Sequence, residues 1–166
     1  MARLVLVGMP GVGKTSVARV VARRWECEAL DTDDLVAVSV GQTVAQFLRA
    51  EGESSFRVHE LAALEGALGV DAVVATGGGV VTTLGARELL AAQTTLWLDC
   101  ANDVILDRLD GVDRPMLGHD PENALALLRD ERERWYVKVS RARVDASGEL
   151  DDVVARVIEA YEEESS

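Results

Sequence analysis

The stretch that decides the fold is Gly8-Met9-Pro10-Gly11-Val12-Gly13-Lys14-Thr15. It follows an apolar run and opens a helical pattern, and its spacing is G-x-x-x-x-G-K-T. Its glycines let backbone N–H groups point inward at phosphate oxygens, and the helix N-terminus beneath adds its positive dipole end. The alternative is a glycine-rich turn with a chance Lys-Thr pair, but the strand before it and the helix after it favour a phosphate-binding loop.

The polar side chains of this loop have predicted tasks. Lys14 is placed to reach the β- and γ-phosphates of a nucleotide, and the Thr15 hydroxyl is placed to ligate the Mg2+ that bridges them. The residues that we expect to contact ATP here are Gly11, Val12, Gly13, Lys14, Thr15 and Ser16. The loop alone predicts binding of ATP or GTP, so the reaction must be inferred from the rest of the chain.

Length, composition and charge limit the class of protein. The 166 residues fit one domain, and a hydrophobic share of 48% is enough for a buried core. No apolar run reaches the roughly 18 to 20 residues that span a bilayer, and no signal-peptide pattern precedes the first strand, so we expect a cytoplasmic protein. The net charge of -12 argues against a nucleic-acid surface. We expect a monomer without membrane or nucleic-acid partners, with reduced thiols at Cys27 and Cys100.

Short apolar strands alternate with amphipathic helices, which is the pattern of a parallel sheet flanked by helices. The expected strands cover about 3–7, a segment ending at Leu30, 72–76, 94–98 and 142–144. The expected helices cover about 14–25, two short pieces within 35–51, and then 53–68, 84–92, 102–109, 122–139 and 150–162. The tail 163–166 is expected to fray. These elements predict an α/β fold.

Acidic residues follow the second strand directly, in Asp31-Thr32-Asp33-Asp34. In extended geometry Asp31 and Asp33 alternate, so their side chains would point the same way, toward the γ-phosphate. One carboxylate could accept a hydrogen bond from Mg2+-bound water while the other orients or deprotonates an acceptor hydroxyl. The alternative task is to cap the following helix, which we favour for Asp34 and not for Asp31 or Asp33.

The third strand stops at Gly77-Gly78-Gly79. Three glycines remove every side chain from a place where ligands bind in open α/β sheets. Many nucleotide-hydrolysing proteins have an Asp at the end of this strand, and here the strand ends in Thr-Gly-Gly-Gly. The carboxylate that supports the metal must then come from elsewhere, and Asp31 is the candidate.

Two arginines outside the phosphate loop are candidates for the site. Arg57 could bind an acceptor carboxylate, although it could also be a solvated helix arginine paired with Glu53 or Glu60. Arg114 lies in the segment 110–121, which holds two glycines and two prolines and therefore looks mobile. We expect this arginine to swing over the phosphates and to expel water when both substrates bind.

Together these motifs resemble the shikimate kinase family. The matching pieces, in order, are Gly8 to Thr15, Leu30-Asp31-Thr32-Asp33, G-E-x-x-F-R-x-x-E from Gly52 to Glu60, Thr76-Gly77-Gly78-Gly79, Arg114-Pro115-Met116-Leu117, and Arg132 four before Tyr136. The resemblance implies a three-layer P-loop fold of the nucleoside-monophosphate-kinase type, with a five-stranded parallel sheet in the order 2-3-1-4-5. It also implies one kinase domain over 1–166, a shikimate-binding helical segment over about 33–61 and a lid over about 111–121.

The resemblance implies an activity as well, which is transfer of the γ-phosphoryl group of ATP to the 3-hydroxyl of shikimate. By this likeness Lys14, Asp33 and Arg114 would be catalytic, with Asp33 as the base. Thr15 would bind Mg2+ directly, and Asp31 would hold it through water. The implied substrate-binding residues are Asp33, Arg57, Gly77, Gly78, Gly79 and Arg132, and the implied ATP-binding residues include Arg108 and Arg114.

Some positions depart from the family pattern. The family's R-x-P-L-Y becomes Arg132-Glu133-Arg134-Trp135-Tyr136, and the missing proline leaves Arg132 or Arg134 able to point into the site. An arginine expected in the adenine loop near Ser147 and Gly148 is absent, so adenine there would be held by backbone and stacking alone. Met116 replaces a leucine, which is a volume-conserving change.

Other functions remain open at this point. A kinase for gluconate or a nucleoside monophosphate would share the loop, the lid and the fold, and quinate is a possible acceptor beside shikimate. A GTP-dependent switch would need N-K-x-D for guanine, and neither lysine of this chain follows an asparagine. A non-catalytic nucleotide binder would be expected to lose Lys14, Asp33 or Arg114, and all are present.

Overall fold

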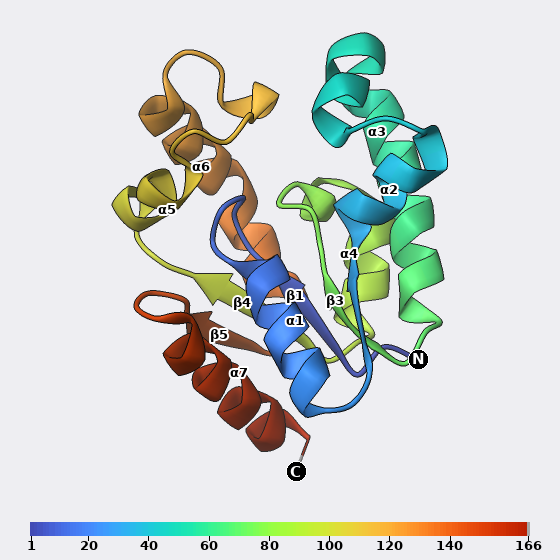
Figure 1. Cartoon of the computed structure of the whole chain (residues 1–166), viewed down its shortest axis with the longest axis vertical. Coiled ribbons are helices and arrows are strands. Elements are labelled where there is room, and N and C mark those ends of the chain that lie inside the picture. Colours follow the sequence, from blue (N-terminus) through green and yellow to red (C-terminus); the bar gives the residue numbers. More distant parts are fainter. Residues whose placement is uncertain (166) are drawn as a thin grey trace.

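A five-stranded parallel sheet forms the middle layer of the computed structural model, which describes residues 1–165 (Figure 1). The strands are β1 (Leu4–Val7), β2 (Glu28–Asp31), β3 (Ala72–Ala75), β4 (Thr95–Asp99) and β5 (Ala142–Asp145). Their order across the sheet is β2-β3-β1-β4-β5, so the expected order is confirmed. The residues of β1, β3 and β4 are all buried, because helices cover both faces of the sheet.

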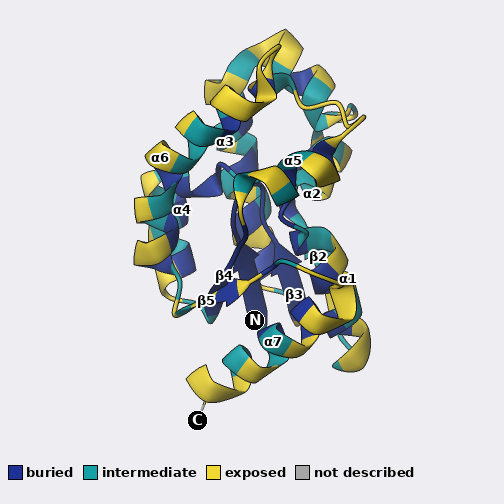
Figure 2. Ribbon diagram, turned by 90° about the vertical axis from the view of Figure 1, so that its left-hand side faces the viewer, coloured by how far each residue is buried: buried dark blue, intermediate teal, exposed yellow. Residues whose placement is uncertain are grey.

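The helices are α1 (Lys14–Arg24), α2 (Thr32–Val40), α3 (Val44–Leu68), α4 (Leu84–Ala91), α5 (Asn102–Leu109), α6 (Pro121–Val139) and α7 (Leu150–Glu164), with short 3-10 turns η1 (Val80–Thr82) and η2 (Pro115–Leu117). Helices α1 and α7 pack together on one face of the sheet, and α4 and α6 pack together on the other (Figure 2). Helix α7 reaches two residues further than expected, and Ser166 lies outside the described residues.

Helix α3 combines two predicted pieces across a break. Gly52 has a φ of 82° and a ψ of 174°, which interrupts the helix between the segments expected before and after it. A small hydrophobic core of Val36, Phe47 and Phe56 joins α2 to α3, apart from the main core around the sheet. Within residues 1–165, no helix combines the length and the apolar character that a bilayer crossing requires.

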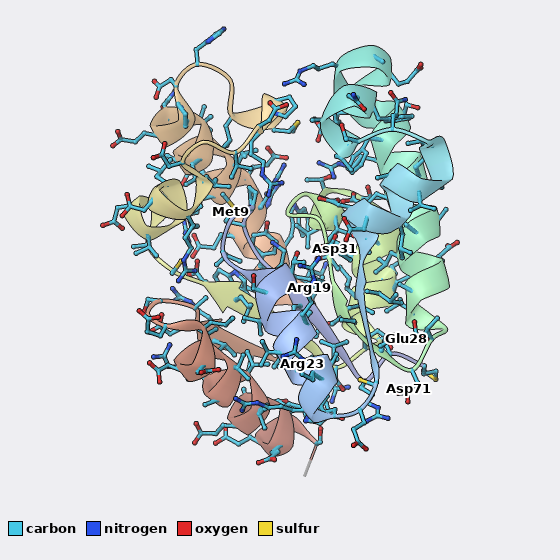
Figure 3. The ribbon with its side chains drawn as sticks, in the orientation of Figure 1. Met9, Arg19, Arg23, Glu28, Asp31 and Asp71 are labelled. Carbon is cyan, nitrogen blue, oxygen red and sulfur yellow. The ribbon has the colours of Figure 1, made fainter. Side chains whose placement is uncertain are left out.

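The topology places the phosphate loop at the centre of the sheet. Strand β1 pairs with β3 on one side and with β4 on the other, so the chain changes direction across the sheet at this point. In open α/β sheets ligands bind at such a switch, beyond the carboxyl ends of the strands. Figure 3 shows Met9 and Asp31 at this end of the sheet, with Glu28 and Asp71 at the opposite end.

Candidate active site

The phosphate loop is folded around its own lysine. Gly8 has a φ of 149°, and a side chain there would collide with the Leu98 carbonyl, so only glycine fits. The Lys14 ammonium is buried and donates to the carbonyls of Gly8 at 2.8 Å and Met9 at 2.9 Å. Burial lowers the pKa of Lys14 to about 8, although the carboxylates of Asp33 and Asp31 act in the opposite direction.

Asp31 connects the phosphate loop to the start of α2. Its Oδ2 accepts a hydrogen bond from the Thr15 hydroxyl, and its Oδ1 accepts one from the Asp33 N–H at 2.9 Å, which caps the helix. The prediction that Asp34 is the cap is therefore wrong, because Asp34 lies in the first turn with an exposed side chain. The predicted extended geometry is also wrong for Asp33, since the helix begins at Thr32.

Asp33 nevertheless reaches the same site from the first turn of α2. Its carboxyl group is buried, and this burial raises its pKa, with the negative charge of Asp31 acting in the same direction. Its Oδ1 has no hydrogen-bond partner. A carboxyl group in this state can bind a ligand hydroxyl or accept its proton.

Arg57 is both a paired helix arginine and a site residue. Its guanidinium donates to Glu60 Oε2 at 2.7 Å and to Glu53 Oε1 at 2.9 Å, and it lines the same cavity as Asp33. Sequence reasoning did not assign Glu60 to the site, although it closes the G-E-x-x-F-R-x-x-E motif. Its carboxyl group is buried, and burial raises its pKa against the effect of Arg57.

The three glycines allow these side chains to converge. A Cβ atom at Gly77 would lie 2.5 Å from Glu60 Oε1 and 2.7 Å from Asp33 Oδ1. A Cβ atom at Gly79 would collide with the guanidinium of Arg57. The absence of side chains after β3 therefore makes room for three charged groups that approach from α2 and α3.

Helix α6 places only one of its two candidate arginines in the cavity. Arg132 is 3% exposed and lines the cavity. Arg134 is exposed and lies over the ring of Trp135, at 4.6 Å from its centroid. Of the two alternatives, Arg132 is the one that the fold places in the site.

Two arginines hold the loop between β5 and α7. Arg108 donates to the carbonyls of Val12 at 2.8 Å, Ala146 at 2.8 Å and Gly148 at 3.4 Å, so it ties this loop to the phosphate loop. Arg156, from α7, donates at 2.9 Å to the carbonyls on either side of Ala146, those of Asp145 and Ser147. Sequence reasoning missed Arg156, because nothing in the local pattern of α7 shows that it reaches back to this loop.

Residues 113–117 of the segment 111–121 line the cavity. Gly111 and Gly118 have φ values of 74° and 60°, and the exposed Arg114 between them lines the cavity. Asp113 is 2.5 Å from Arg49 of α3, which joins this segment to the helices opposite. The cavity beneath measures about 820 Å³ and is lined by the phosphate loop, the three glycines, Asp33, Arg57, Arg114 and Arg132.

A phosphate loop beside a cleft with buried carboxylates and arginines defines a P-loop kinase that acts on a small polar acceptor. A model of the shikimate kinase family matches residues 10–162, and the chain belongs to this family. It is 38% identical to the shikimate kinase of Symbiobacterium thermophilum over 96% of each chain. It is 36% identical to the shikimate kinase of Corynebacterium jeikeium over 97% of this chain and 89% of the relative.

Solved structures of shikimate kinases resemble this chain over nearly its whole length. A shikimate kinase from Acinetobacter baumannii in complex with shikimate superposes with a TM-score of 0.91 at 30% identity, over 95% of this chain and 90% of that one. The shikimate kinase from Aquifex aeolicus gives a TM-score of 0.84 at 26% identity, over 99% and 98% of the two chains. A gluconokinase from Sinorhizobium meliloti gives 0.63 at 19% identity over 96% and 91%, a likeness of fold alone.

Proposed function

We propose that this chain transfers the γ-phosphoryl group of ATP to the 3-hydroxyl of shikimate, giving ADP and shikimate 3-phosphate. One observation carries the proposal. Of the five buried side-chain atoms without a hydrogen-bond partner in residues 1–165, four line the acceptor side of the cavity: Asp33 Oδ1, Arg57 Nε, Glu60 Oε1 and Arg132 Nε. Buried polar atoms are normally paired, so this group marks where a ligand supplies the partners.

The chemistry of these atoms fits an acceptor that carries both a carboxylate and hydroxyl groups. Arg57 and Arg132 would grip the carboxylate, because a guanidinium matches its two oxygens. Asp33 would accept a hydrogen bond from the hydroxyl that attacks the phosphate and would act as its base. The backbone of Gly77 to Gly79 would approach the ring closely.

On the donor side, the residues Gly11 to Ser16 would surround the phosphates of ATP. Lys14 would exchange its bonds to the Gly8 and Met9 carbonyls for bonds to phosphate oxygens. Arg108 would lie against the adenine, and Arg114 would stabilise the charge on the transferring group. Closure of the lid over 111–121 would then exclude the water that could hydrolyse ATP.

The donor set also fits Mg2+. The Thr15 hydroxyl and the Asp31 carboxylate are in contact, and hard cations prefer oxygen ligands of this kind. Thr15 would bind the ion directly, and Asp31 would hold it through water. When bound, Mg2+ would neutralise charge on the phosphates. Within residues 1–165 no group of three or more His, Cys, Asp or Glu forms a metal site, and a phosphate-bound Mg2+ needs only one or two protein ligands.

We also propose that the protein is a cytoplasmic monomer that binds ATP and shikimate and has no nucleic-acid or membrane partners. The net charge of -12 supports the lack of a nucleic-acid surface. The helical segment 33–61 would hold the acceptor, and its separate small core supports that role.

An ADP-release assay with Mg2+ and ATP tests the proposal. Shikimate, quinate, gluconate and AMP are compared as acceptors at equal concentration. We expect turnover with shikimate to exceed that with gluconate and AMP by a factor of at least ~10³, because buried polar groups left unpaired reject a poorly matched acceptor. Equal turnover with gluconate would favour the gluconate kinase alternative, and no shikimate-dependent turnover would refute the proposal.

A further inference from the structure

In the loop Gly77 to Gly79, every backbone N–H and carbonyl group has a hydrogen-bond partner within the described part of the chain except two N–H groups. The Gly77 N–H donates to the Thr32 hydroxyl at 3.0 Å, and the Gly77 carbonyl accepts from the Val80 N–H at 3.2 Å. The Gly79 carbonyl accepts from the N–H and the hydroxyl of Thr82, at 3.0 and 2.7 Å. Within residues 1–165, the N–H groups of Gly78 and Gly79 have no partner.

The Gly78 carbonyl is the remaining group, and it accepts a hydrogen bond from the Tyr136 hydroxyl. Tyr136 lies on α6 and is 1% exposed, with its ring stacked on Trp97 at 5.8 Å and its hydroxyl 3.9 Å from the sulfur of Met9. Burial raises the pKa of Tyr136, so the hydroxyl keeps the proton that it donates. Tyr136 does not itself line the cavity.

Because the peptide bond is planar, the hydrogen bond from Tyr136 to the Gly78 carbonyl also fixes the direction of the Gly79 N–H. The Gly78 carbonyl and the Gly79 N–H belong to one planar trans peptide, so they point in opposite directions. A flip of this peptide would move the φ of Gly79 from its present −94° to a positive value. Most residues resist that change, but glycine does not, so the sequence of three glycines leaves the flip open.

We propose that Tyr136 is a positioning residue that locks the peptide between Gly78 and Gly79, so that the Gly79 N–H points at the acceptor. This inference rests on the proposed function. Gly79 itself lies beside the guanidinium of Arg57, since a side chain on Gly79 would collide with it, and its N–H points away from Tyr136, opposite to the Gly78 carbonyl. Both donors therefore serve the same oxygen-rich end of the acceptor. If the peptide flipped, a carbonyl would face that end and repel it.

The test is the variant Tyr136→Phe, which keeps the buried ring and removes the hydroxyl. Because that hydroxyl lies near Arg132 as well as the Gly78 carbonyl, amide hydrogen exchange at Gly79 in the variant accompanies the kinetics and should show changed protection. We expect the KM for shikimate to rise about tenfold, or about 1.4 kcal/mol, with the KM for ATP within about twofold of wild type. The matched control is Tyr161→Phe, because Tyr161 is the other of the two tyrosines and packs against Trp25, far from the loop. The control should change neither KM. An unchanged KM for shikimate, or an equal rise in both, would overturn the inference.

A second measurement needs only the wild-type protein and therefore holds even if the variant does not fold. Amide hydrogen exchange at Gly79 should be fast without ligand and slow with saturating shikimate. Protection at Gly79 before shikimate is added, or no change after it, would contradict the proposed orientation. If wild type consumes no shikimate, the proposed function fails. If wild type is active and Tyr136→Phe behaves as wild type, only the role of Tyr136 fails.

Discussion

The donor and acceptor sides of the cavity differ in how their polar groups are satisfied. On the donor side Lys14 and Arg108 are already bonded to backbone carbonyls, and Thr15 is bonded to Asp31. On the acceptor side, polar atoms of Asp33 and Arg132 are buried and have no partner. Nucleotide binding must therefore exchange existing hydrogen bonds, whereas acceptor binding creates new ones.

This difference indicates where selectivity comes from. An exchange of one hydrogen bond for another yields a modest net free energy, while a buried group left unpaired costs the whole desolvation penalty. A wrong acceptor leaves such groups unpaired, so the acceptor side discriminates strongly. Variants that change binding on the donor side should accordingly alter the KM for ATP, whereas variants that change binding on the acceptor side should alter the KM for shikimate.

The largest expected effect belongs to the lid. Arg114→Ala should lower kcat by a factor of about 10³, because arginines that stabilise a transferring phosphoryl group contribute roughly 10³ to 10⁵. Steady-state kinetics at saturating ATP and shikimate measure it. Arg141→Ala is the control, since Arg141 is exposed and does not line the cavity. A change in kcat of less than about threefold in Arg114→Ala would remove Arg114 from the catalytic group.

The next effect separates the two arginines of α6. Arg132→Ala should raise the KM for shikimate by about 100-fold, which is the loss of a charged hydrogen bond of about 2.7 kcal/mol, and should leave the KM for ATP within about twofold. Arg134→Ala, on the exposed face of the same helix, should change neither constant. If Arg134→Ala had the larger effect, the assignment of Arg132 would be wrong.

The same pattern is expected at Arg57. Arg57→Ala should raise the KM for shikimate strongly with little change in the KM for ATP, although it also leaves Glu60 buried without its partner. Thermal unfolding of the variant separates the loss of binding from a loss of stability. Equal rises in both KM values would point to a structural role for Arg57.

The pH profile should differ between the free and the nucleotide-bound protein. In the free protein kcat/KM for ATP should fall above about pH 8, because Lys14 loses its proton there. It should also fall on the acid side at a pH above the usual range of an aspartate, because the pKa of Asp33 is raised and its base form is lost by protonation. Bound phosphates favour the charged lysine, so the basic limb of kcat should move to higher pH. A basic limb at the same pH in both profiles would contradict this.

The smallest effect concerns the loop near adenine. Arg156→Ala removes two hydrogen bonds to backbone carbonyls at a partly exposed position, so the KM for ATP should rise about threefold, with the KM for shikimate unchanged. Arg24→Ala is the control, because Arg24 lies on α1 and reaches α7, where its guanidinium is 3.7 Å from Asp151. An equal effect in both variants would mean that α7, and not the loop, has been disturbed.

Much of the fold and some of the site followed from the sequence alone. The strand order was predictable from the resemblance to a known family, and most helices were predictable from the apolar periodicity of the chain. Asp31 and Asp33 both line the cavity, but the predicted geometry was wrong, since Asp31 caps a helix that begins one residue later. A local pattern cannot decide between extended and helical geometry at such a boundary.

The remaining contacts depend on how helices are placed. Arg132 and Arg134 are two residues apart, which is about 200° around a helix, so only one can face the cavity. Which one it is depends on how α6 packs against the sheet. Arg156 and Tyr136 act on loops distant in sequence, and no spacing rule connects them to these loops.

The most direct test of the whole account is ³¹P NMR of the protein with Mg2+, ATP and shikimate. The account predicts that ADP and a phosphate ester on the 3-hydroxyl of shikimate form in equal amounts, with no ADP formed when shikimate is left out. It would be contradicted by ADP that forms at the same rate without shikimate, or by a mixture that contains no shikimate phosphate ester.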